Sequence, residues 1–359
     1  VNLYPCRVVP STGRLIFSAR LRVTITTRPE GGGLPSYIGG RDRAPMRRIL
    51  ADVQNPEAVA ATAHDLPRDV SRGELSAAGS SNVPYLIITS ADLAASFSRI
   101  ASLKEMMGLK TMIKTVESIA IEMPGADLQE QIRNYIIYAC QQYQTEYVLL
   151  GGDSEIIPPR PLYVKAGTEI EPDIPSDLYY AALDGDWNTD GDAYFGEPGE
   201  DDLIPEVTLG RLPASEASQV LVFSDKLEKY TLYPDPSSCT TSLMLGELLW
   251  DDIVTTWGGD YKDEILYGTD NFGFTTAGIP AGFDNGTLYD RDLGNWTISN
   301  LLPLLDAGVN LVNHLGHSAI HTVMNIPIWE VANLTGDGPG WIPFVCYSQG
   351  CYPAAFDNR

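Results

Sequence analysis

Apolar and polar residues follow different patterns in different parts of the chain. Over residues 13–28 apolar and polar positions alternate, which is the pattern of a half-buried β-strand or strand pair. Between residues 31 and 82 this alternation is lost, Gly, Pro and Ser are frequent, and only residues 47–60 have the spacing of a short helix. The pattern predicts a β-segment over 1–30 and a linker over 31–82.

From residue 83 onward, apolar runs alternate with segments of helical apolar spacing. Strands are expected over 83–90, 109–116, 147–153 and 207–213, and helices over 91–108, 126–143 and 215–233. Strands that alternate with helices in this way predict a parallel sheet with helices on both of its faces. Residues 83–236 are therefore expected to form a first subdomain, A.

The same alternation starts again at Cys239 and predicts a second subdomain, B, over residues 237–359. Its expected strands are 242–249, 264–268, 308–317 and 341–351, with a helix over 296–308. The predicted fold class is thus α/β, with mainly parallel sheets flanked by helices in two subdomains. Subdomain B is expected to be incomplete at its C-terminal end, because few residues follow its last strand.

Charge and composition exclude several classes of function. The chain has 47 acidic and 24 basic residues and a net charge of −23, which does not suit binding to nucleic acid. No stretch reaches the roughly 18 apolar residues of a transmembrane helix, and Val1 is not followed by a signal-peptide pattern. We therefore expect no transmembrane segment, and expect that any export signal has been removed.

The cysteines do not form a recognisable framework. The five cysteines are Cys6, Cys140, Cys239, Cys346 and Cys351. They include no CxxC pair, so neither a zinc ribbon nor a dense set of disulfides is expected, and the odd number leaves at least one thiol free.

A thiol and an imidazole stand at the ends of the last two predicted strands. Ligands of open α/β sheets bind at the carboxyl ends of the strands, and Cys351 and His317 both lie there. A buried cysteine is more often a small hydrophobic residue, but the position of Cys351 after Gly350 favours a nucleophile. We expect Cys351 to attack a carbonyl carbon and His317 to move the proton.

The spacing of three histidines also requires a zinc site to be considered. His314, His317 and His321 read as HxxHxxxH, with Cys351 expected nearby. Side chains three residues apart on an extended strand point to opposite sides, so this spacing does not place the ligands on one face. We therefore expect His314 and His321 to be packing or surface residues.

An acidic insertion between residues 184 and 197 fits the template of a calcium-binding loop. Oxygen ligands fall at alternate positions, Gly191 permits the turn, and a final Glu can bind with both oxygens. The candidate Ca²⁺ ligands are Asp184, Asp186, Asn188, Asp190, Asp192, Tyr194 and Glu197. Carboxylates concentrated in this way would repel one another without a cation.

From about Val83 to Arg359 the sequence resembles the gingipain family of cysteine peptidases, which shares its caspase-like fold with clostripain and the caspases. The resemblance is carried jointly by YVLLGGDSEIIPP, PSDLYY, EVTLGRLP, NHLGHS and IPFVCYSQGCYPAAFD. It implies a calcium-stabilised cysteine endopeptidase that acts on proteins or peptides through a thioester on Cys351.

The resemblance also implies roles around the catalytic pair. Glu247 stands where the family has a carboxylate that orients the histidine, although Asp251 and Asp252 lie close by and compete for this role. The oxyanion hole would use the N–H groups of Cys351 and of the residue after the histidine. That residue is Ser318 here, whereas the family commonly has Gly.

For substrate recognition, the resemblance implies an acidic S1 pocket shortly after this loop. We expect Asp260 or Asp263, with Glu264 as a further alternative, to bind a basic P1 side chain. A carboxylate pairs with a guanidinium in a two-pronged geometry, so Arg would be preferred over Lys.

The resemblance finally bears on maturation and location. Residues 1–30 resemble the end of a propeptide, Arg68 and Arg72 are candidate cleavage sites, and Arg359 could be another. A secreted or cell-surface zymogen that processes itself is implied, with a further chain or C-terminal segment completing the catalytic domain. The alternative is a catalytically idle, calcium-binding surface or adhesion module, which the intact Cys351 and His317 disfavour.

Overall fold

The computed structural model describes residues 6–9, 14–17, 82–273, 275–331 and 342–357. The chain divides into two compact units, Val1–Ile38 and Gly39–Arg359. In the smaller unit, β1 (Cys6–Val9) and β2 (Arg14–Phe17) form an antiparallel hairpin. The predicted helix over 47–60, the linker up to residue 81 and the cleavage sites Arg68 and Arg72 lie outside the described residues.

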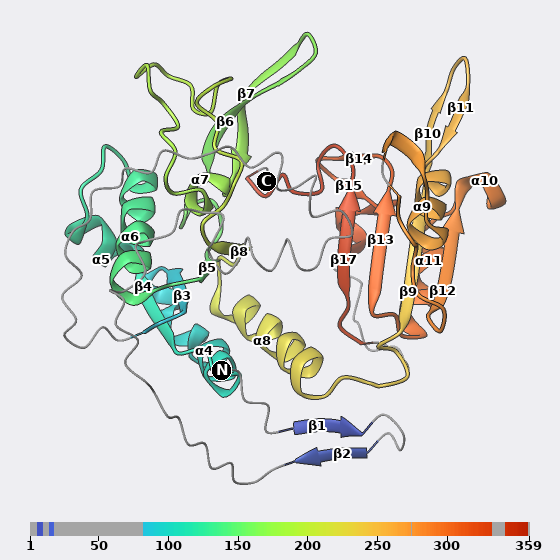
Figure 1. Cartoon of the computed structure of the whole chain (residues 1–359), viewed down its shortest axis with the longest axis horizontal. Helices are drawn as coiled ribbons and strands as arrows, with labels where there is room; N and C mark the ends of the chain where they lie inside the picture. Colours follow the sequence, from blue (N-terminus) through green and yellow to red (C-terminus); the bar gives the residue numbers. More distant parts are fainter. Residues whose placement is uncertain (1–5, 10–13, 18–81, 274, 332–341, 358–359) are drawn as a thin grey trace, which may run out of the picture. The chain divides into compact units, whose positions relative to one another are not determined.

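The first sheet of the larger unit has four parallel strands in the order β4-β3-β5-β8 (Figure 1). Its strands are β3 (Tyr85–Thr89), β4 (Thr111–Thr115), β5 (Tyr147–Gly151) and β8 (Thr208–Leu212). Leu86 and Ile88 point to one face of the sheet and Ile87 to the other, because side chains alternate along a strand. Both faces are therefore buried under helices, as the sequence predicts.

Two groups of helices cover these faces. The Leu86 face packs against α5 (Val116–Glu122) and α6 (Leu128–Tyr143). The Ile87 face packs against α3 (Ala91–Ala94), η2 (Ala95–Phe97), α4 (Ser98–Met106) and α8 (Ala217–Leu232). The single helix expected over 91–108 is thus interrupted by one 3₁₀ turn.

The second sheet also has four parallel strands, in the order β12-β9-β13-β17 (Figure 1). Its strands are β9 (Thr241–Gly246), β12 (Asp284–Tyr289), β13 (Leu311–Leu315) and β17 (Val345–Gln349). One face packs against α11 (Ile298–Asp306) through Leu243, Leu245 and Val312, and α9 (Gly258–Tyr267) contacts the same sheet. Among the described strands β17 ends the sheet, and most of its residues are exposed.

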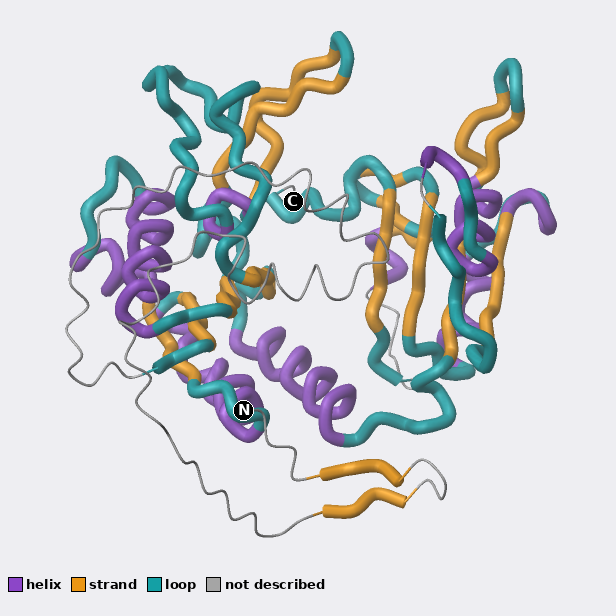
Figure 2. Tube along the Cα trace, viewed as in Figure 1, coloured by secondary structure: helices purple, strands orange, loops and turns teal. Residues whose placement is uncertain are grey.

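Shorter elements lie outside the two four-stranded sheets, and two hairpins project away from them (Figure 2). They include two antiparallel hairpins, β6 (Arg160–Ala166) with β7 (Glu169–Ser176) and β10 (Leu248–Asp251) with β11 (Thr255–Trp257). The remaining pieces are α7 (Leu178–Ala181), η3 (Asn271–Gly273), α10 (Asp290–Leu293), β14 (Ser318–Ala319), β15 (Thr322–Val323), β16 (Ile326–Pro327) and α12 (Ile328–Val331). No helix within the described ranges is long and apolar enough to cross a membrane.

The predicted fold class is confirmed, but two elements of the second sheet are not as predicted. Residues 264–268, expected to be a strand, form the end of helix α9, where Lys262 and Leu266 lie one turn apart and are both buried. The fourth strand of this sheet is instead β12, which comes later in the chain. The strand expected over 242–249 ends at Gly246, and β10 begins at Leu248.

A buried lysine lies between α9 and the second sheet. Lys262 is 2% exposed, and its ammonium group donates to Asn313 Oδ1 at 2.7 Å. Burial lowers the pKa of Lys262 from 10.5 to about 8. Between pH 8 and 10.5 the unfolded chain therefore holds more protons than the folded chain, so the free energy of unfolding rises with pH in this window.

We expect Lys262→Met to remove this rise, which amounts to at most about 3 kcal/mol over the window. The measurement is urea unfolding of both proteins at several pH values from 7 to 10. Lys226→Met changes an exposed lysine on α8 and serves as the control, because it should leave the pH dependence unchanged. Equal slopes for the wild type and Lys262→Met would contradict the prediction.

Candidate active site

Three adjacent parallel strands bring the candidate residues to one edge of the second sheet. Gly246 of β9 and Gln349 of β17 both lie opposite Leu315 of β13. Just beyond them, the N–H of Glu247 donates to the Leu315 carbonyl at 3.0 Å, and the N–H of Gly316 donates to the Gln349 carbonyl at 3.1 Å. The segments that carry Glu247, His317 and Cys351 therefore leave the sheet side by side.

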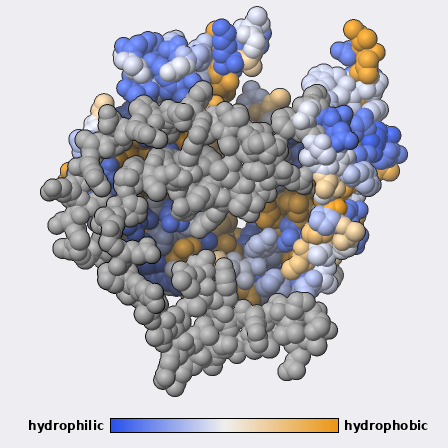
Figure 3. Space-filling view, viewed as in Figure 1, coloured by the Kyte–Doolittle hydropathy of each residue, from blue (hydrophilic) through white to orange (hydrophobic). Residues whose placement is uncertain are grey.

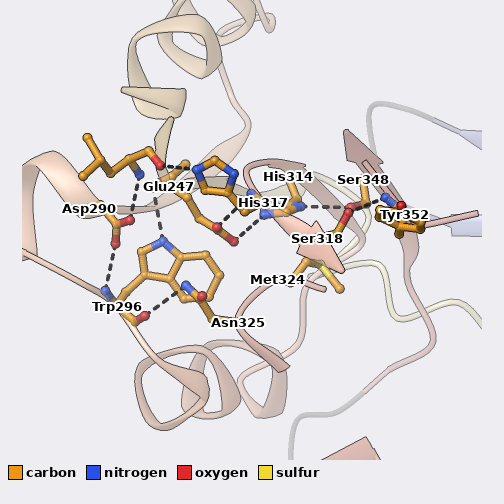
Figure 4. Close-up of polar contacts among 12 residues, drawn as sticks. Glu247, Asp290, Trp296, His314, His317, Ser318, Met324, Asn325, Ser348 and Tyr352 are labelled. Carbon is orange, nitrogen blue, oxygen red and sulfur yellow. Dashed lines mark hydrogen bonds and ion pairs between the residues drawn. The ribbon is translucent and has the colours of Figure 1, made fainter. Parts of the chain in front are cut away.

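The ring of His317 is held by a backbone carbonyl (Figure 4). Its Nε2 lies 2.9 Å from the carbonyl oxygen of Leu248, and the residue is exposed. A carbonyl oxygen only accepts hydrogen bonds, so this contact requires the proton on Nε2. Nδ1 then carries the lone pair of the neutral imidazole, which is the form a general base needs.

The residue whose carbonyl holds His317 is itself fixed by a buried carboxylate. Asp290 is 5% exposed; one of its oxygens accepts from the N–H of Leu248 at 2.8 Å, and the other accepts from the N–H of Trp296 at 2.9 Å. The Trp296 indole in turn donates to the Gly246 carbonyl at 3.3 Å. The main chain is thus held on both sides of the β9–β10 break, at the Gly246 carbonyl and at the N–H of Leu248.

Glu247 acts on His317 differently from the sequence expectation. One carboxylate oxygen accepts from the backbone N–H of His317 at 2.9 Å, and the other lies 2.9 Å from Nε2 of His314 (Figure 4). The carboxylate therefore holds the main chain of His317, while the ring is oriented by Leu248. Gly316 is required beside it, because a Cβ there would lie 2.3 Å from the Glu247 carboxyl carbon.

Cys351 is exposed and is held against Ser318 by the residues on either side of it. The N–H of Tyr352 donates to the Ser318 hydroxyl at 2.6 Å. A Cβ on Gly350 would lie 2.7 Å from the same oxygen, so Gly350 is needed for close approach. Because Ser318 directly follows His317, the structure brings thiol, imidazole and the two expected oxyanion donors into one region.

The two aspartates expected in the S1 pocket are engaged elsewhere. Asp260 and Asp263 both pair with Arg291, the latter at 2.6 Å, and Asp263 also accepts from the Tyr289 hydroxyl at 3.2 Å. Desolvation lowers the pKa of Arg291, but its hydrogen bonds to Asp263 and Asp260 outweigh this and raise it. An arginine of the chain itself already pairs with both carboxylates, so we do not retain them as substrate-binding residues.

A cavity of about 660 Å³ lies beside His317. Its lining residues are Glu247, Leu248, Leu249, Trp250, Asp251, Asp290, Asn295, Trp296, Thr297, Ile298, His317, Asn325, Pro327 and Glu330. The β10–β11 hairpin forms part of its rim, and the hairpin tip is apolar, with Ile253 96% exposed (Figure 3). Neither Asp260 nor Asp263 lines this cavity, whereas Asp251 does.

The acidic loop divides the expected calcium ligands into separate groups. Asp190 and Glu197 converge with Glu200, which the loop template does not include, with oxygens within 4.8 Å of one another. Partial desolvation, and then the neighbouring carboxylates, raise the pKa of Glu197. Asn188 Oδ1 and Glu200 Oε2 are buried without a hydrogen-bond partner. An oxygen-binding cation fits the Asp190, Glu197 and Glu200 cluster, because it would satisfy Glu200 Oε2 and offset the repulsion.

The other expected ligands do not join that cluster. Asp184 gathers with Asp202 and Glu206 in a second group. The Asp186 carboxylate accepts from the N–H of Asn188 at 3.2 Å, and the Asp192 carboxylate accepts from the N–H of Tyr194 at 2.6 Å. The Tyr194 ring lies edge-on against Tyr163. Asp186 and Asp192 shape the loop in this structure, so Glu200 replaces them in our candidate set.

Fold and site together define a class of protein. Parallel sheets between helices, with a cysteine and a histidine beyond the carboxyl ends of adjacent strands, are the arrangement of caspase-like cysteine peptidases. Residues 78–359 match the model of peptidase family C25, which covers well over half of the chain. The chain belongs to peptidase family C25, and the predicted membership in a gingipain-type cysteine peptidase family is confirmed.

Individual relatives are distant. An uncharacterized protein from Archaeoglobus fulgidus is 23% identical over a 312-residue alignment that covers 78% of this chain and 68% of that protein. The complex of the Porphyromonas gingivalis RgpB pro- and mature domains has a TM-score of 0.54 at 18% identity, over 76% of this chain and 56% of that one. The Arg-specific cysteine proteinase gingipain R (RGPB) has a TM-score of 0.53 at 19% identity, over 77% and 56%. These structures show the fold alone, and the chain spans about half their length.

Proposed function

We propose that this chain is a cysteine endopeptidase in which Cys351 is the nucleophile and His317 the general base. The observation that carries the proposal is the position of Ser318: its hydroxyl accepts from the N–H of Tyr352 and leaves no room for a Cβ on Gly350, and Ser318 itself follows His317. The segments that follow β13 and β17 therefore lie close together. The fixed tautomer of His317 leaves Nδ1 as the proton acceptor.

The reaction then proceeds in two balanced steps. His317 takes the thiol proton of Cys351, the sulfur forms a bond to the substrate carbonyl carbon, and the C–N bond breaks as the proton passes to the leaving amine. Water, deprotonated by His317, adds to the resulting thioester, and the thiolate leaves and is reprotonated. Backbone N–H groups of Cys351 and Ser318 would stabilise the oxyanion in both steps.

For the substrate, we propose a basic P1 side chain that enters the cavity beside His317. Asp251 and Glu330 place carboxylates on its lining, and Trp250 and Trp296 add indole rings. A guanidinium can pair with a carboxylate and stack on an indole, whereas an ammonium does only part of this. Arg is therefore expected to be preferred over Lys, with Asp251 taking the role first assigned to Asp260 or Asp263.

The test is hydrolysis of fluorogenic peptides with Arg, Lys, Leu or Asp at P1 by the full chain. Asp251→Asn should lower kcat/KM for the Arg substrate about 10-fold, as expected for the loss of one charge-assisted hydrogen bond, and leave the Leu substrate unchanged. The control is Asp252→Asn, the adjacent exposed aspartate, which does not line the cavity. A preference for Asp at P1, or equal effects of both variants, would contradict a basic pocket.

We also propose that Ca²⁺ stabilises the acidic loop through Asp190, Glu197, Glu200 and Asn188. Thermal unfolding with 1 mM Ca²⁺ is expected at a higher temperature than with a chelator. The free energy of unfolding should rise by about 2.7 kcal/mol when Ca²⁺ reaches 100 times its Kd. Glu200→Gln should remove most of this difference. Glu169→Gln, on the β6–β7 hairpin, should keep it. Identical melting with Ca²⁺ and with the chelator would contradict the calcium site.

Secretion or display at the cell surface, synthesis as a zymogen that processes itself, and completion by a further chain or segment are also proposals. They are supported by the family membership and by the RgpB complex of pro- and mature domains that this chain resembles in fold. Mass spectrometry of the purified protein before and after incubation, for wild type and Cys351→Ala, would show whether cleavage depends on its own thiol.

A further inference from the structure

We propose that His314 is a positioning residue for the peptidase reaction, through the hydrogen bonds that join it to Glu247 and to Ser348. The inference rests on the proposed function, because it assigns His314 a part in the same reaction. His314 touches neither substrate nor the reacting atoms. His314 acts through two main-chain segments: one carries the base and one oxyanion donor, and the other carries the nucleophile.

The imidazole of His314 is held on three sides. Its side chain is 0% exposed, Nε2 lies 2.9 Å from Glu247 Oε1, and Nδ1 lies 2.9 Å from the Ser348 hydroxyl (Figure 4). The Trp296 ring lies edge-on to it, with the ring centroids 6.4 Å apart at 89°. A carboxylate oxygen only accepts, so Nε2 carries a proton. The ring therefore has one defined orientation.

Its surroundings argue against a role in packing alone. Val312, two residues earlier on the same strand and face, is an ordinary apolar core residue. Burial of a polar ring costs free energy unless both nitrogens find partners, and here both partners belong to the catalytic edge of the sheet. An apolar side chain would fill the same space without the free-energy cost of burying polar nitrogens. Packing alone therefore does not account for a histidine at this position.

The first contact controls the segment that carries the base. Glu247 has two oxygens: one faces His314, and the other accepts from the backbone N–H of His317. Without the imidazole the carboxylate would be free to rotate, and a buried charge would lose a partner. The backbone N–H of His317, between Gly316 and Ser318, would then lose its fixed acceptor, although the Leu248 carbonyl would still hold the ring.

The second contact controls the segment that carries the nucleophile. Ser348 lies opposite His314 in the β13–β17 register and precedes Cys351 by three residues. The same ring thus links β9, through Glu247, to β17, through Ser348. One buried side chain thereby sets the relative placement of base and thiol, a placement in which an error of about 1 Å costs about 100-fold in rate.

The test compares His314→Leu with His314→Gln in the full chain, because the Gln amide can still donate to Glu247. His314→Leu should lower kcat about 30-fold with KM changed less than about 3-fold, whereas His314→Gln should recover most of the loss. Amide hydrogen exchange of residues 316–318 should be about 10-fold faster in His314→Leu. His321→Leu, at an exposed histidine of the same segment, is the control and should match the wild type.

Several outcomes would overturn the proposal. These are a wild-type kcat for His314→Leu, an unchanged exchange rate at residues 316–318, or a loss in His314→Gln as large as in His314→Leu. If His314→Leu does not fold, Ser348→Ala replaces it and should lower kcat about 5-fold; no effect would again count against the proposal. If the wild type cleaves no peptide, the proposed function fails, while hydrogen exchange still decides the positioning contact.

Discussion

Replacement of Cys351 by alanine is expected to abolish peptide hydrolysis, with kcat/KM falling about 10⁴-fold or more. The reason is that no other described cysteine of the larger unit stands at the candidate catalytic edge. Cys140 is buried in the first sheet's core, Cys239 precedes β9 at the opposite end of its strand, and Cys346 lies near the start of β17, opposite Val312. Hydrolysis through a thioester requires this sulfur, and the bound water that remains is a poor nucleophile. The measurement is steady-state cleavage of the Arg peptide by both proteins.

Two further experiments make the result specific. Cys239→Ala removes another exposed thiol and should retain full activity. Alkylation by iodoacetamide, read by mass spectrometry for each cysteine peptide, should inactivate the wild type in step with modification of Cys351. Residual activity of Cys351→Ala above about one tenth of wild type would reject Cys351 as the nucleophile.

The second large effect is expected for His317→Asn, which should lower kcat about 10³-fold. Asparagine keeps a donor near the Leu248 carbonyl but has no group that accepts and returns a proton at neutral pH. The alkylation rate of Cys351 at pH 7 should fall as well, because the thiol loses its base. Steady-state kinetics and the same peptide-resolved alkylation measure the two effects.

His321→Asn provides the matched control for this change, since that histidine is exposed and follows β14. It should reproduce the wild-type kcat and alkylation rate. A kcat for His317→Asn within about 10-fold of wild type would show that another group takes the proton.

Periodicity predicted the architecture well because buried parallel strands and amphipathic helices have distinct patterns. All four strands of the first sheet, and β9, β13 and β17 of the second, fall where apolar runs predict them. It failed at residues 264–268, where a short apolar run fits a strand or a helix end equally well. The close packing of α9 on β9 is visible only in three dimensions: a Cβ on Gly246 would lie 2.3 Å from the nitrogen of Gly259, near the start of α9.

The sequence motifs predict the candidate catalytic residues but not the groups that orient them. His317 and Cys351 stand out because each follows a predicted strand. The groups that orient them do not: the Leu248 carbonyl is main chain, and Asp290, which accepts from the N–H of Leu248, lies 42 residues away with no motif around it.

Contacts between residues far apart in the sequence also explain why the candidate pocket residues and calcium ligands differ from those predicted. The sequence shows that Asp260 and Asp263 are acidic, but not that Arg291 pairs with them. A spacing template selects ligands by position along the chain, so it passes over Glu200, which joins the cluster only once the loop has folded back.

The place of β17 at the end of its sheet has a consequence for the chemical ageing of the protein. His317 follows a strand bonded on both sides, whereas Cys351 follows a strand bonded on one side within the described part of the chain. Edge strands open locally at lower free energy than central strands. Cys351 is already exposed, and each opening of β17 further frees the segment that carries it while the imidazole stays in place. We therefore expect storage in air to oxidise Cys351, and so to inactivate the proposed active site, long before the fold is lost.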